Sequence, residues 1–500
     1  MTENGQKRDL LHGPVTRRRL LQVSAVGGAA AFLAACSAAA TPAPTAKPTA
    51  APTAAPTAAP TAAPTAAPTA APTAAPTAAP TAAPTAAPTA APTAAPTPTP
   101  APTAADYTGV NLHVWSGGTS FPPIDAASAE FEASSGAKVV REIVPGAERA
   151  IKFAGLIATA DPTIDVLYGW TQFVGQFGDR LYTDLTTLNV DSSPFLPAIV
   201  EALSFDGKLR IVPEHSEMEI YIYNKQHFQD AGLDPEKKDW TWDELYAAAP
   251  ALTKGNRYPC AMPFGTGAYY WLCFFNSIPG SQLLSEDRTQ VLFNSDAGLL
   301  AFQSLDKGFK AKFFDPAFFS GVDDYATGKV FNGGGTASQI NFSELWAQAV
   351  SKNVKDFGAT IDPAVVGATI VPGIAPGTSG TINGFEGFGI SQFSLNKDAS
   401  FALLSVLGSK EFQLKMNTFN LPSSRTDVLT DPENLKVFPV GDVLARQGTF
   451  NLNRYPSPYD WTAPINNSIT KMIKGEYTAE EAHVVAFKGV EDIVIKYLSS

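Results

Sequence analysis

The pattern of apolar and polar positions predicts alternating strands and helices in the later part of the chain. Short runs rich in β-branched and aromatic residues predict strands at 110–115, 137–143 and 164–168. Amphipathic stretches predict helices around 126–134 and 147–160, between those strands. Such alternation is typical of an α/β fold with a mostly parallel sheet and helices on both faces. In these sheets, ligands meet the loops that follow the carboxyl ends of the strands.

The first 36 residues carry a different pattern. Three consecutive arginines, at 17–19, precede an uncharged apolar run at 20–35. A basic start followed by such a run predicts a secretory signal peptide. The run is shorter than the roughly 20 residues that a membrane-spanning helix needs. The arginines and the apolar residues after them resemble the twin-arginine consensus, which implies export by that route.

The apolar run ends at a cysteine. The tetrad at 33–36, Leu-Ala-Ala-Cys, resembles a bacterial lipobox. A lipobox cysteine takes the lipid and becomes the mature N-terminus, so the resemblance implies lipidation of Cys36. The expected location is then extracytoplasmic, with a lipid anchor in the outer face of the cytoplasmic membrane. A buried or chance cysteine is the alternative.

Residues 37–105 have no pattern that could form a core. From 41 to 104 the sequence repeats Thr-Ala-Ala-Pro and contains one charged side chain, Lys47. Regular proline breaks helices, and Ala and Thr bury too little apolar surface to offset the ordering entropy. We expect an extended linker, which at about 3.1 Å per residue could span on the order of 200 Å. Its composition also suits O-glycosylation.

The part that is left to fold, residues 106–500, is longer than one hydrophobic core normally serves, so two lobes are expected. The chain has a formal net charge of −11. Because residues 1–36 carry five basic and two acidic side chains, the remainder is near −14. An acidic balance without blocks of lysine or arginine argues against nucleic acid and against electrostatic docking on anionic lipid.

Motifs that carry chemistry are sparse. Cys260 and Cys273 lie in an exported domain, where a disulfide could persist, and two buried thiols are the alternative. The segment 213–219 holds three glutamates and one histidine, but their spacing fits no closed metal site. No motif for a nucleophile, a zinc protease or a phosphate loop is present. We therefore expect no catalytic residue, no cofactor and no metal.

Several segments, taken in order, resemble the family of extracellular solute-binding proteins that includes maltose-type receptors. The matching segments are 205–213, 220–225, 228–233, 240–245, 383–391 and 473–497. The strongest of them contain Tyr-Asn-Lys, Ala-Gly-Leu and Thr-Trp-Asp-Glu-Leu. The departures are Arg210 and Ile211, where the family has an aromatic residue and a glycine, and Trp346, which stands three residues beyond the family position.

The resemblance implies a two-lobed, periplasmic-binding-protein-like fold of type II, with a sheet flanked by helices in each lobe. It puts lobe 1 at about 106–217 and 368–420, lobe 2 at about 218–367 and 421–500, and hinges near Glu217, Gly367 and Asn420. It further implies a monomer that captures a small solute, a mono- or oligosaccharide, for the permease subunits of an ABC importer. A secreted glycoside hydrolase and a surface adhesion protein on a stalk are the alternatives.

Candidate solute contacts begin with aromatic residues, because sugar rings present apolar faces to them. The candidates end expected strands or lie in loops flanked by glycine or proline. They are Trp115, Trp170, Tyr269, Trp271 and Trp461, with Ser116 beside the first. Packing in the core is the alternative for each ring.

Polar candidates flank the expected hinges. In a strand, His215 and Glu217 would share one face. By resemblance, Glu217 falls where maltose-type receptors carry a glutamate that binds sugar, and a carboxylate can accept hydrogen bonds from two hydroxyls. A solvated hinge charge is the alternative. The family pattern also places Asn341, Phe385 and Glu386 near the solute.

Overall fold

The computed structural model describes residues 105–117, 122–216, 218–264, 268–285, 287–319, 324–382, 385–418, 421–450 and 461–499. The signal segment, Cys36, nearly all of the repeat linker, Glu217 and the hinge expected near Asn420 lie outside these residues.

The first lobe is built on a five-stranded sheet of order β2-β1-β3-β11-β6. Its strands are β1 (Asn111–Ser116), β2 (Lys138–Ile143), β3 (Val166–Trp170), β6 (Val212–His215) and β11 (Glu386–Ile390). β1 pairs in parallel with β2 and β3, whereas β11 runs antiparallel to β3 and β6. The three strands expected at the start of the folded part are confirmed, and so is their parallel pairing.

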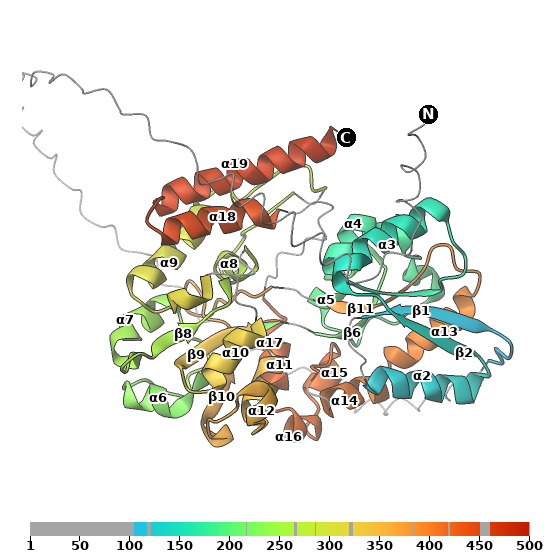
Figure 1. Ribbon diagram of the computed structural model, residues 1–500, viewed down its shortest axis with the longest axis horizontal. Helices are drawn as coiled ribbons and strands as arrows, with labels where there is room; N and C mark the ends of the chain where they lie inside the picture. The colour runs from blue at the N-terminus through green and yellow to red at the C-terminus, as the bar shows by residue number, and fades with distance from the viewer. Residues whose placement is uncertain are drawn as a thin grey trace, which may run out of the picture. The chain divides into compact units, whose positions relative to one another are not determined.

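Helices cover both faces of this sheet, with α3 and α4 on one face and α2, α13 and α14 on the other (Figure 1). The helices of this lobe are α2 (Pro122–Ser135), α3 (Gly146–Thr159), α4 (Thr171–Leu181), η1 (Leu185–Leu188), α5 (Pro197–Ala202), α13 (Lys397–Leu407), α14 (Lys410–Thr418), α15 (Thr426–Leu429) and α16 (Asn434–Val437). A small hairpin, β4 (Ser204–Phe205) and β5 (Lys208–Leu209), packs beside α4.

The second lobe is built on a four-stranded sheet of order β10-β7-β9-β8. Its strands are β7 (Glu219–Asn224), β8 (Tyr258–Ala261), β9 (Thr336–Phe342) and β10 (Val366–Thr369). All six residues of β7 are buried, as expected for a central strand with helices on both faces. The surrounding helices are α6 (Lys225–Asp230), α7 (Trp242–Leu252), α8 (Ala268–Phe275), α9 (Asp296–Lys310), η3 (Pro316–Phe319), α10 (Asp324–Asn332), α11 (Glu344–Val350), α12 (Val354–Phe357), η4 (Pro363–Val365), α17 (Gly441–Gln447), α18 (Thr462–Ile473) and α19 (Ala479–Leu498).

Two crossings join the sheets, one from β6 to β7 and one from β10 to β11. Gly367 itself lies inside β10 and pairs with Tyr223 of β7, and the crossing expected near this residue follows the end of the strand at Thr369. A Cβ at this position would come within 2.7 Å of the Tyr223 ring. The glycine therefore allows close packing within the second sheet, and the crossing follows β10.

The last boundary also lies later than the expected change of lobe at 420–421. Helix α14 packs on β6 and α2 of the first lobe, and α15 and α16 pack on α14. Helix α17 packs on α15 and α16 and also contacts β7 of the second sheet, and its Gln447 side chain accepts a hydrogen bond from the Val371 backbone at 2.9 Å. The chain thus returns to the second lobe after α16.

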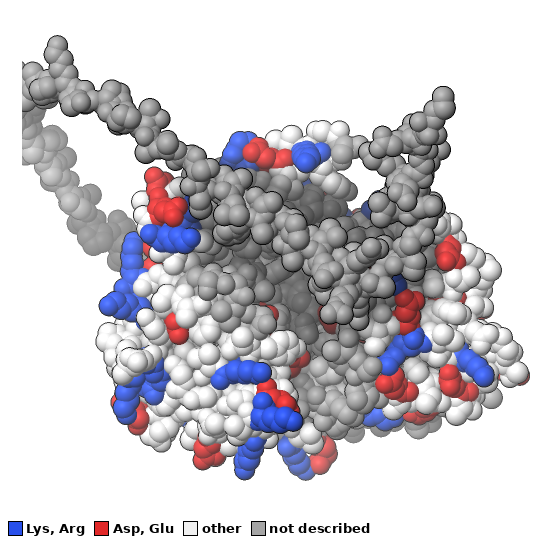
Figure 2. All heavy atoms as spheres, viewed as in Figure 1, with Lys and Arg blue, Asp and Glu red and all other residues white. Residues whose placement is uncertain are grey.

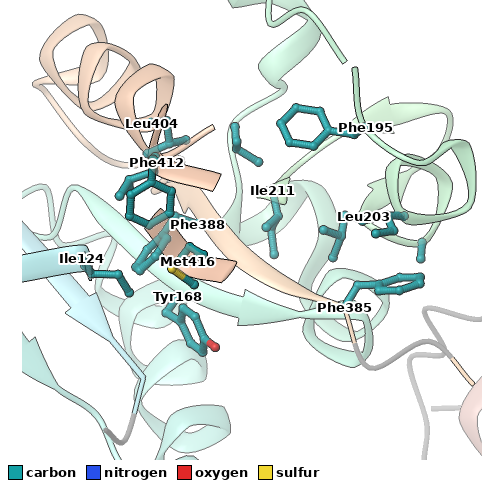
Figure 3. Close-up of a cluster of buried hydrophobic side chains, with 14 of the residues drawn as sticks. Ile124, Tyr168, Phe195, Leu203, Ile211, Phe385, Phe388, Leu404, Phe412 and Met416 are labelled. Carbon is teal, nitrogen blue, oxygen red and sulfur yellow. The ribbon is translucent and has the colours of Figure 1, made fainter. Parts of the chain in front are cut away.

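Each lobe has an aromatic-rich core. In the first, the rings of Tyr168 and Phe388 meet edge to face with centroids 5.1 Å apart, and Phe412 and Met416 of α14 pack nearby (Figure 3). The second core contains Cys260 and Cys273 as free, buried thiols. The thiol alternative, rather than the disulfide, is what the structure shows.

The surface carries charges of both signs. Lysine and arginine side chains lie intermixed with aspartate and glutamate over the face in view (Figure 2). Among the described helices, none combines the length and the apolarity that crossing a bilayer requires.

Candidate functional site

One edge of the first sheet collects the polar candidates. β1, β3 and β6 run in the same direction, and β11 runs against them, so the carboxyl ends of three strands meet the start of the fourth. The register places Glu386 directly opposite Trp170 on one side and His215 on the other. Three residues far apart in the sequence thus form one row across adjacent strands, beside both crossings.

A β-bulge shapes this row. The register between β11 and β6 shifts between Glu386 and Gly387. A Cβ at position 387 would lie 2.1 Å from the backbone oxygen of Val212, so only glycine permits this approach of the two strands. Bulges bend a strand and re-aim its side chains, and here the bulge lies at Glu386.

The polar side chains of the row lie close to one another and to two neighbours. His215 Nε2 lies 3.8 Å from Glu386 Oε2, and His215 Nδ1 lies 3.8 Å from Glu214 Oε2. The Tyr168 hydroxyl donates to Glu386 Oε2. The side chains of Glu214 and His215 are almost fully buried, whereas that of Glu386 is 19% exposed. Glu386 is the carboxylate of this group that a solute can reach.

A buried arginine completes the group. The Arg149 guanidinium lies 4.6 Å from the Trp170 ring centroid and 5.1 Å from that of Tyr168. Burial lowers the pKa of Arg149, while Tyr168 and Glu386 act in the opposite direction. Nothing in the sequence pattern marks Arg149, because an arginine in an amphipathic helix is usually solvated. We call Arg149, Tyr168, Trp170, His215 and Glu386 the first-lobe cluster.

The two tryptophans at the strand ends are both half-buried. Trp170 stacks on Phe173 with ring centroids 4.2 Å apart, beside the Arg149 guanidinium, and the rest of its side chain is partly exposed. Trp115, on β1, donates from Nε1 to Glu142 Oε2 at 3.0 Å, and Lys152 Nζ lies 5.3 Å from its ring. Ser116 is buried and donates to the Glu142 carbonyl at 3.3 Å.

A second polar group lies in the other lobe. The Tyr270 hydroxyl donates to Asp324 Oδ1 at 2.5 Å, and Asn341 Nδ2 donates to the Asp324 carbonyl at 2.9 Å. Glu219, the first residue of β7, is fully buried and accepts from Thr381 Oγ1 and the Ile382 backbone, each at 2.9 Å. We call Glu219, Tyr270, Asp324 and Asn341 the second-lobe cluster. Sequence reasoning identified only Asn341 among them as a candidate.

Glu219 has a strongly shifted acidity. Burial raises its pKa from 4.5 to about 8, the negative charge of Asp324 acts in the same direction, and the bonds from Ile382 and Thr381 oppose the rise. Its Oε1 has no hydrogen-bond partner among the described residues. Because Thr381 and Ile382 belong to the crossing from β10 to β11, this carboxyl ties that crossing to the start of β7.

Two aromatic candidates lie in the cores. Trp271 is fully buried and stacks on Phe275 with centroids 4.9 Å apart, and Phe293 and Phe302 pack against it. Phe385 is also fully buried, within the first core (Figure 3). Neither ring leaves a face for a solute, so core packing replaces the expected contact at both positions.

The remaining candidates are Asn341, Tyr269, Trp461 and Glu217, and they do not share one environment. Asn341 is buried, and its Nδ2 is occupied by Asp324. Tyr269 is half-buried and meets Trp461 edge to face at 6.0 Å, at the base of α18. Glu217 lies outside the described residues. Among the described side chains, no group of three or more His, Cys, Asp or Glu could hold a metal ion.

Comparison with known sequences identifies a family to which this chain is similar. The sequence model of the bacterial extracellular solute-binding proteins matches residues 116–414. A probable amino-acid ABC transporter periplasmic-binding protein of Sinorhizobium fredii is 25% identical over 237 residues, which are 47% of this chain and 52% of that protein. An sn-glycerol-3-phosphate-binding periplasmic protein of Rhizobium meliloti is 38% identical over 73 residues, 14% and 17% of the two chains. The chain thus spans about half the length of the first curated relative, and less of the second.

Solved structures share the fold over most of the chain. The sugar-binding protein of Xanthomonas citri has a TM-score of 0.67 at 19% identity and covers 78% of this chain and 98% of its own. A maltose-bound protein of T. maritima has a TM-score of 0.64 at 20% identity, with 78% and 100% covered. The two-lobed fold expected from the sequence is therefore confirmed. With its family model matched over more than half of its length, the chain belongs to the bacterial extracellular solute-binding protein family.

Proposed function

We propose that this protein is the exported, lipid-anchored binding component of an ABC importer. It captures a mono- or oligosaccharide between its two lobes and delivers it to the permease subunits in the membrane. It works as a monomer, by binding rather than by catalysis, and needs no cofactor. Membership of the solute-binding family supports the binding role.

The observation that carries this proposal is the row of Trp170, Glu386 and His215 at the strand ends beside the crossings. A partly exposed indole offers a surface for the apolar face of a sugar ring. A carboxylate accepts charge-assisted hydrogen bonds from hydroxyls. One aromatic surface and one accessible acceptor, held by neighbouring strands, suit a neutral polyhydroxylated solute.

Structural relatives support the same class of solute. The solved structures include complexes with maltose, with ribitol, with α-D-tagatose and with D-mannitol, all of which are uncharged and rich in hydroxyls. The curated relatives instead name an amino acid and sn-glycerol 3-phosphate. Because Glu386 is the accessible charge of the first-lobe cluster, we favour a neutral solute over an anionic one.

Capture requires the solute to favour the closed arrangement of the lobes through contacts with both of them. The first-lobe cluster supplies one side. In the second lobe, Tyr269 and Asp324 are partly accessible, whereas Trp461, which packs against Tyr269, is buried in the second core instead of being a solute contact. The crossings from β6 to β7 and from β10 to β11, together with the return of the chain after α16, provide the hinge.

Isothermal titration calorimetry with maltose, ribitol, glycerol 3-phosphate and a neutral amino acid tests the proposal. We expect maltose or ribitol to bind with a dissociation constant in the micromolar range and glycerol 3-phosphate to bind at least tenfold more weakly. Preferential binding of the phosphate or the amino acid would overturn the sugar class. If none of the four binds, the receptor function is contradicted for the classes that the relatives name.

The anchor needs a separate test. Cells that produce the chain are fed an alkyne fatty acid, and the protein is examined for incorporated label. We expect label on the wild type and none on Cys36→Ser. Equal labelling of both chains would remove Cys36 as the lipid site.

A further inference from the structure

Two turns from different lobes meet away from the row of Trp170, Glu386 and His215. In the first lobe, Phe205 ends β4 and Asp206 begins the turn that joins β4 to β5. The second-lobe turn lies between Leu284 and Val291, which form an antiparallel bridge, and it carries Arg288. Their contact links the lobes at a place that none of the crossings between the lobes occupies.

The Phe205 ring packs against helix α4 at Gly178. Gly178 breaks the helical geometry of α4, with φ +43° and ψ −127°. A Cβ at this position would lie 2.9 Å from three atoms of the Phe205 ring. The glycine therefore both permits the positive φ and leaves room for the ring. This packing holds the Phe205 ring against the first lobe.

Arg288 of the second lobe covers this ring. Its guanidinium carbon lies 4.8 Å from the Phe205 centroid, within the range of a cation–π contact. Its Nη1 also lies 3.9 Å from Asp206 Oδ1. Because the Asp206 side chain is 70% exposed, water screens this ion pair and the ring contact is the stronger link.

The turn that presents Arg288 is held by its own hydrogen bonds. Asp287 Oδ1 accepts from Ser285 Oγ at 2.6 Å and from the Thr289 backbone at 3.1 Å. The Arg288 backbone donates to the Ser285 carbonyl at 2.8 Å and has φ 61°, a left-handed conformation that costs energy outside glycine. These hydrogen bonds hold the Arg288 backbone in its left-handed conformation and so orient the Arg288 side chain.

Both lobes line the small cavity beside this contact. Gln176 and Arg180 of α4 contribute from the first lobe, and Tyr497 and Leu498 of the last turn of α19 from the second. Figure 1 shows α19 extending above the second lobe toward α4, on the side away from β6 and β11. The contact lies away from the crossings, so a small rotation of one lobe about them moves Arg288 away from Phe205. The contact is therefore sensitive to the angle between the lobes.

We propose that Arg288 and Phe205 form an interlobe latch that favours the closed arrangement and so raises solute affinity without touching the solute. This inference rests on the proposed function, since it assumes that closure and capture are coupled. A latch acts on affinity through the population of the competent arrangement: the observed dissociation constant rises as that population falls. Arg288 and Phe205 are positioning residues in this scheme.

Electron–electron distance measurements on spin labels test the latch without any solute. Labels go to the exposed positions Ile151→Cys in α3 and Val484→Cys in α19, which are 76% and 58% exposed. Cys260 and Cys273 are buried, and Cys36→Ser keeps the N-terminal region unlabelled. We expect Arg288→Ala to shift the interlobe distances to longer values, and Arg288→Lys to keep most of the wild-type distribution because it retains a cation at the ring.

Calorimetry with the sugar or polyol that binds the wild type gives the second readout. Arg288→Ala should weaken binding about fivefold, the equivalent of about 1 kcal/mol. Arg180→Ala is the matched control, since the Arg180 guanidinium donates to the Gln176 carbonyl of its own helix. Asp206→Asn should change affinity less than about twofold. Melting temperatures verify that each variant is folded.

The outcomes separate the two proposals. Unchanged distances in Arg288→Ala would contradict the latch, whatever the solute. Tighter binding by that variant would show that the contact favours the open arrangement, which overturns the proposal. If the distances lengthen but none of the four solutes binds the wild type, the latch stands and the proposed function fails. Should Arg288→Ala misfold, Phe205→Leu against Phe205→Tyr repeats the comparison from the ring side.

Discussion

The first-lobe and second-lobe clusters contain similar residues but differ in how far their glutamates are exposed. Each has a carboxylate at the start of a strand that follows a crossing, Glu386 on β11 and Glu219 on β7, and each has a tyrosine hydroxyl in its network. The Glu386 side chain is 19% exposed, whereas Glu219 is fully buried. The difference in exposure separates the carboxyl group that we propose as a solute contact from the one that ties the two crossings together.

The buried carboxyl joins parts of the chain that must move together. Glu219 accepts hydrogen bonds from Thr381 and Ile382 of the second crossing, while its own residue follows the first crossing. In the first lobe, the same two crossings are flanked by His215 and Glu386. Polar links between the crossings therefore exist in both lobes, but only the first-lobe link is open to solvent.

The largest expected effect comes from a tryptophan in the second core. Trp271→Ala should lower the free energy of unfolding by about 3–5 kcal/mol, because it removes a fully buried ring that packs on three phenylalanines. Urea denaturation followed by circular dichroism measures this. A loss below about 1 kcal/mol would mean that Trp271 is not a core residue and would reopen its assignment to the solute pocket.

Glu219→Gln should change how stability depends on pH. The folded protein keeps the Glu219 proton up to about pH 8, whereas the unfolded chain ionises from about pH 4.5, so the stabilisation is complete below 4.5 and is lost as pH rises to 8. The variant lacks this loss and should be more stable than the wild type at pH 8 by up to about 4 kcal/mol.

Melting temperatures of the wild type and Glu219→Gln between pH 5 and pH 8.5 check this expectation. The two curves should converge near pH 5 and separate as the pH rises. Parallel curves would show that Glu219 is not a buried acid with a raised pKa.

Trp170→Ala should weaken solute binding about tenfold, because it removes the exposed aromatic surface of the first-lobe cluster. Its melting temperature should fall by only a few degrees, in contrast with Trp271→Ala, since the ring is only half-buried. Calorimetry with the solute that binds the wild type measures the affinity, and Trp170→Phe should restore most of it. Full affinity in the alanine variant would take Trp170 out of the pocket.

Glu386→Gln has the smallest expected effect, a loss of about fivefold in affinity. The amide keeps one acceptor oxygen but loses the negative charge that strengthens hydrogen bonds from hydroxyls. The same calorimetric series measures it, and glycerol 3-phosphate should gain relative to maltose in the variant because the repulsion of its phosphate is removed. A gain in maltose affinity would place Glu386 outside the contact set.

The sequence marked part of the site and missed the rest for identifiable reasons. Trp170, His215 and Glu386 were each chosen from strand ends and family motifs, and the sheet register brings them into one row. Arg149 and Glu219 have no sequence signal, because their importance comes from burial. The sequence predicts Trp271 as a contact from its glycine-flanked stretch and Phe385 from the family pattern, but both rings are fully buried, and an aromatic side chain can pack inward at either kind of position.

Local pattern was sufficient to predict strands, helices, the α/β class and two lobes, since apolar periodicity and chain length constrain these directly. The ordered family motifs were sufficient for the family. Only the tertiary structure decided where the chain changes lobes, which carboxyl is sealed, and that Phe205 meets Arg288. Pairing register and burial join residues that lie many positions apart, and no local pattern contains that information.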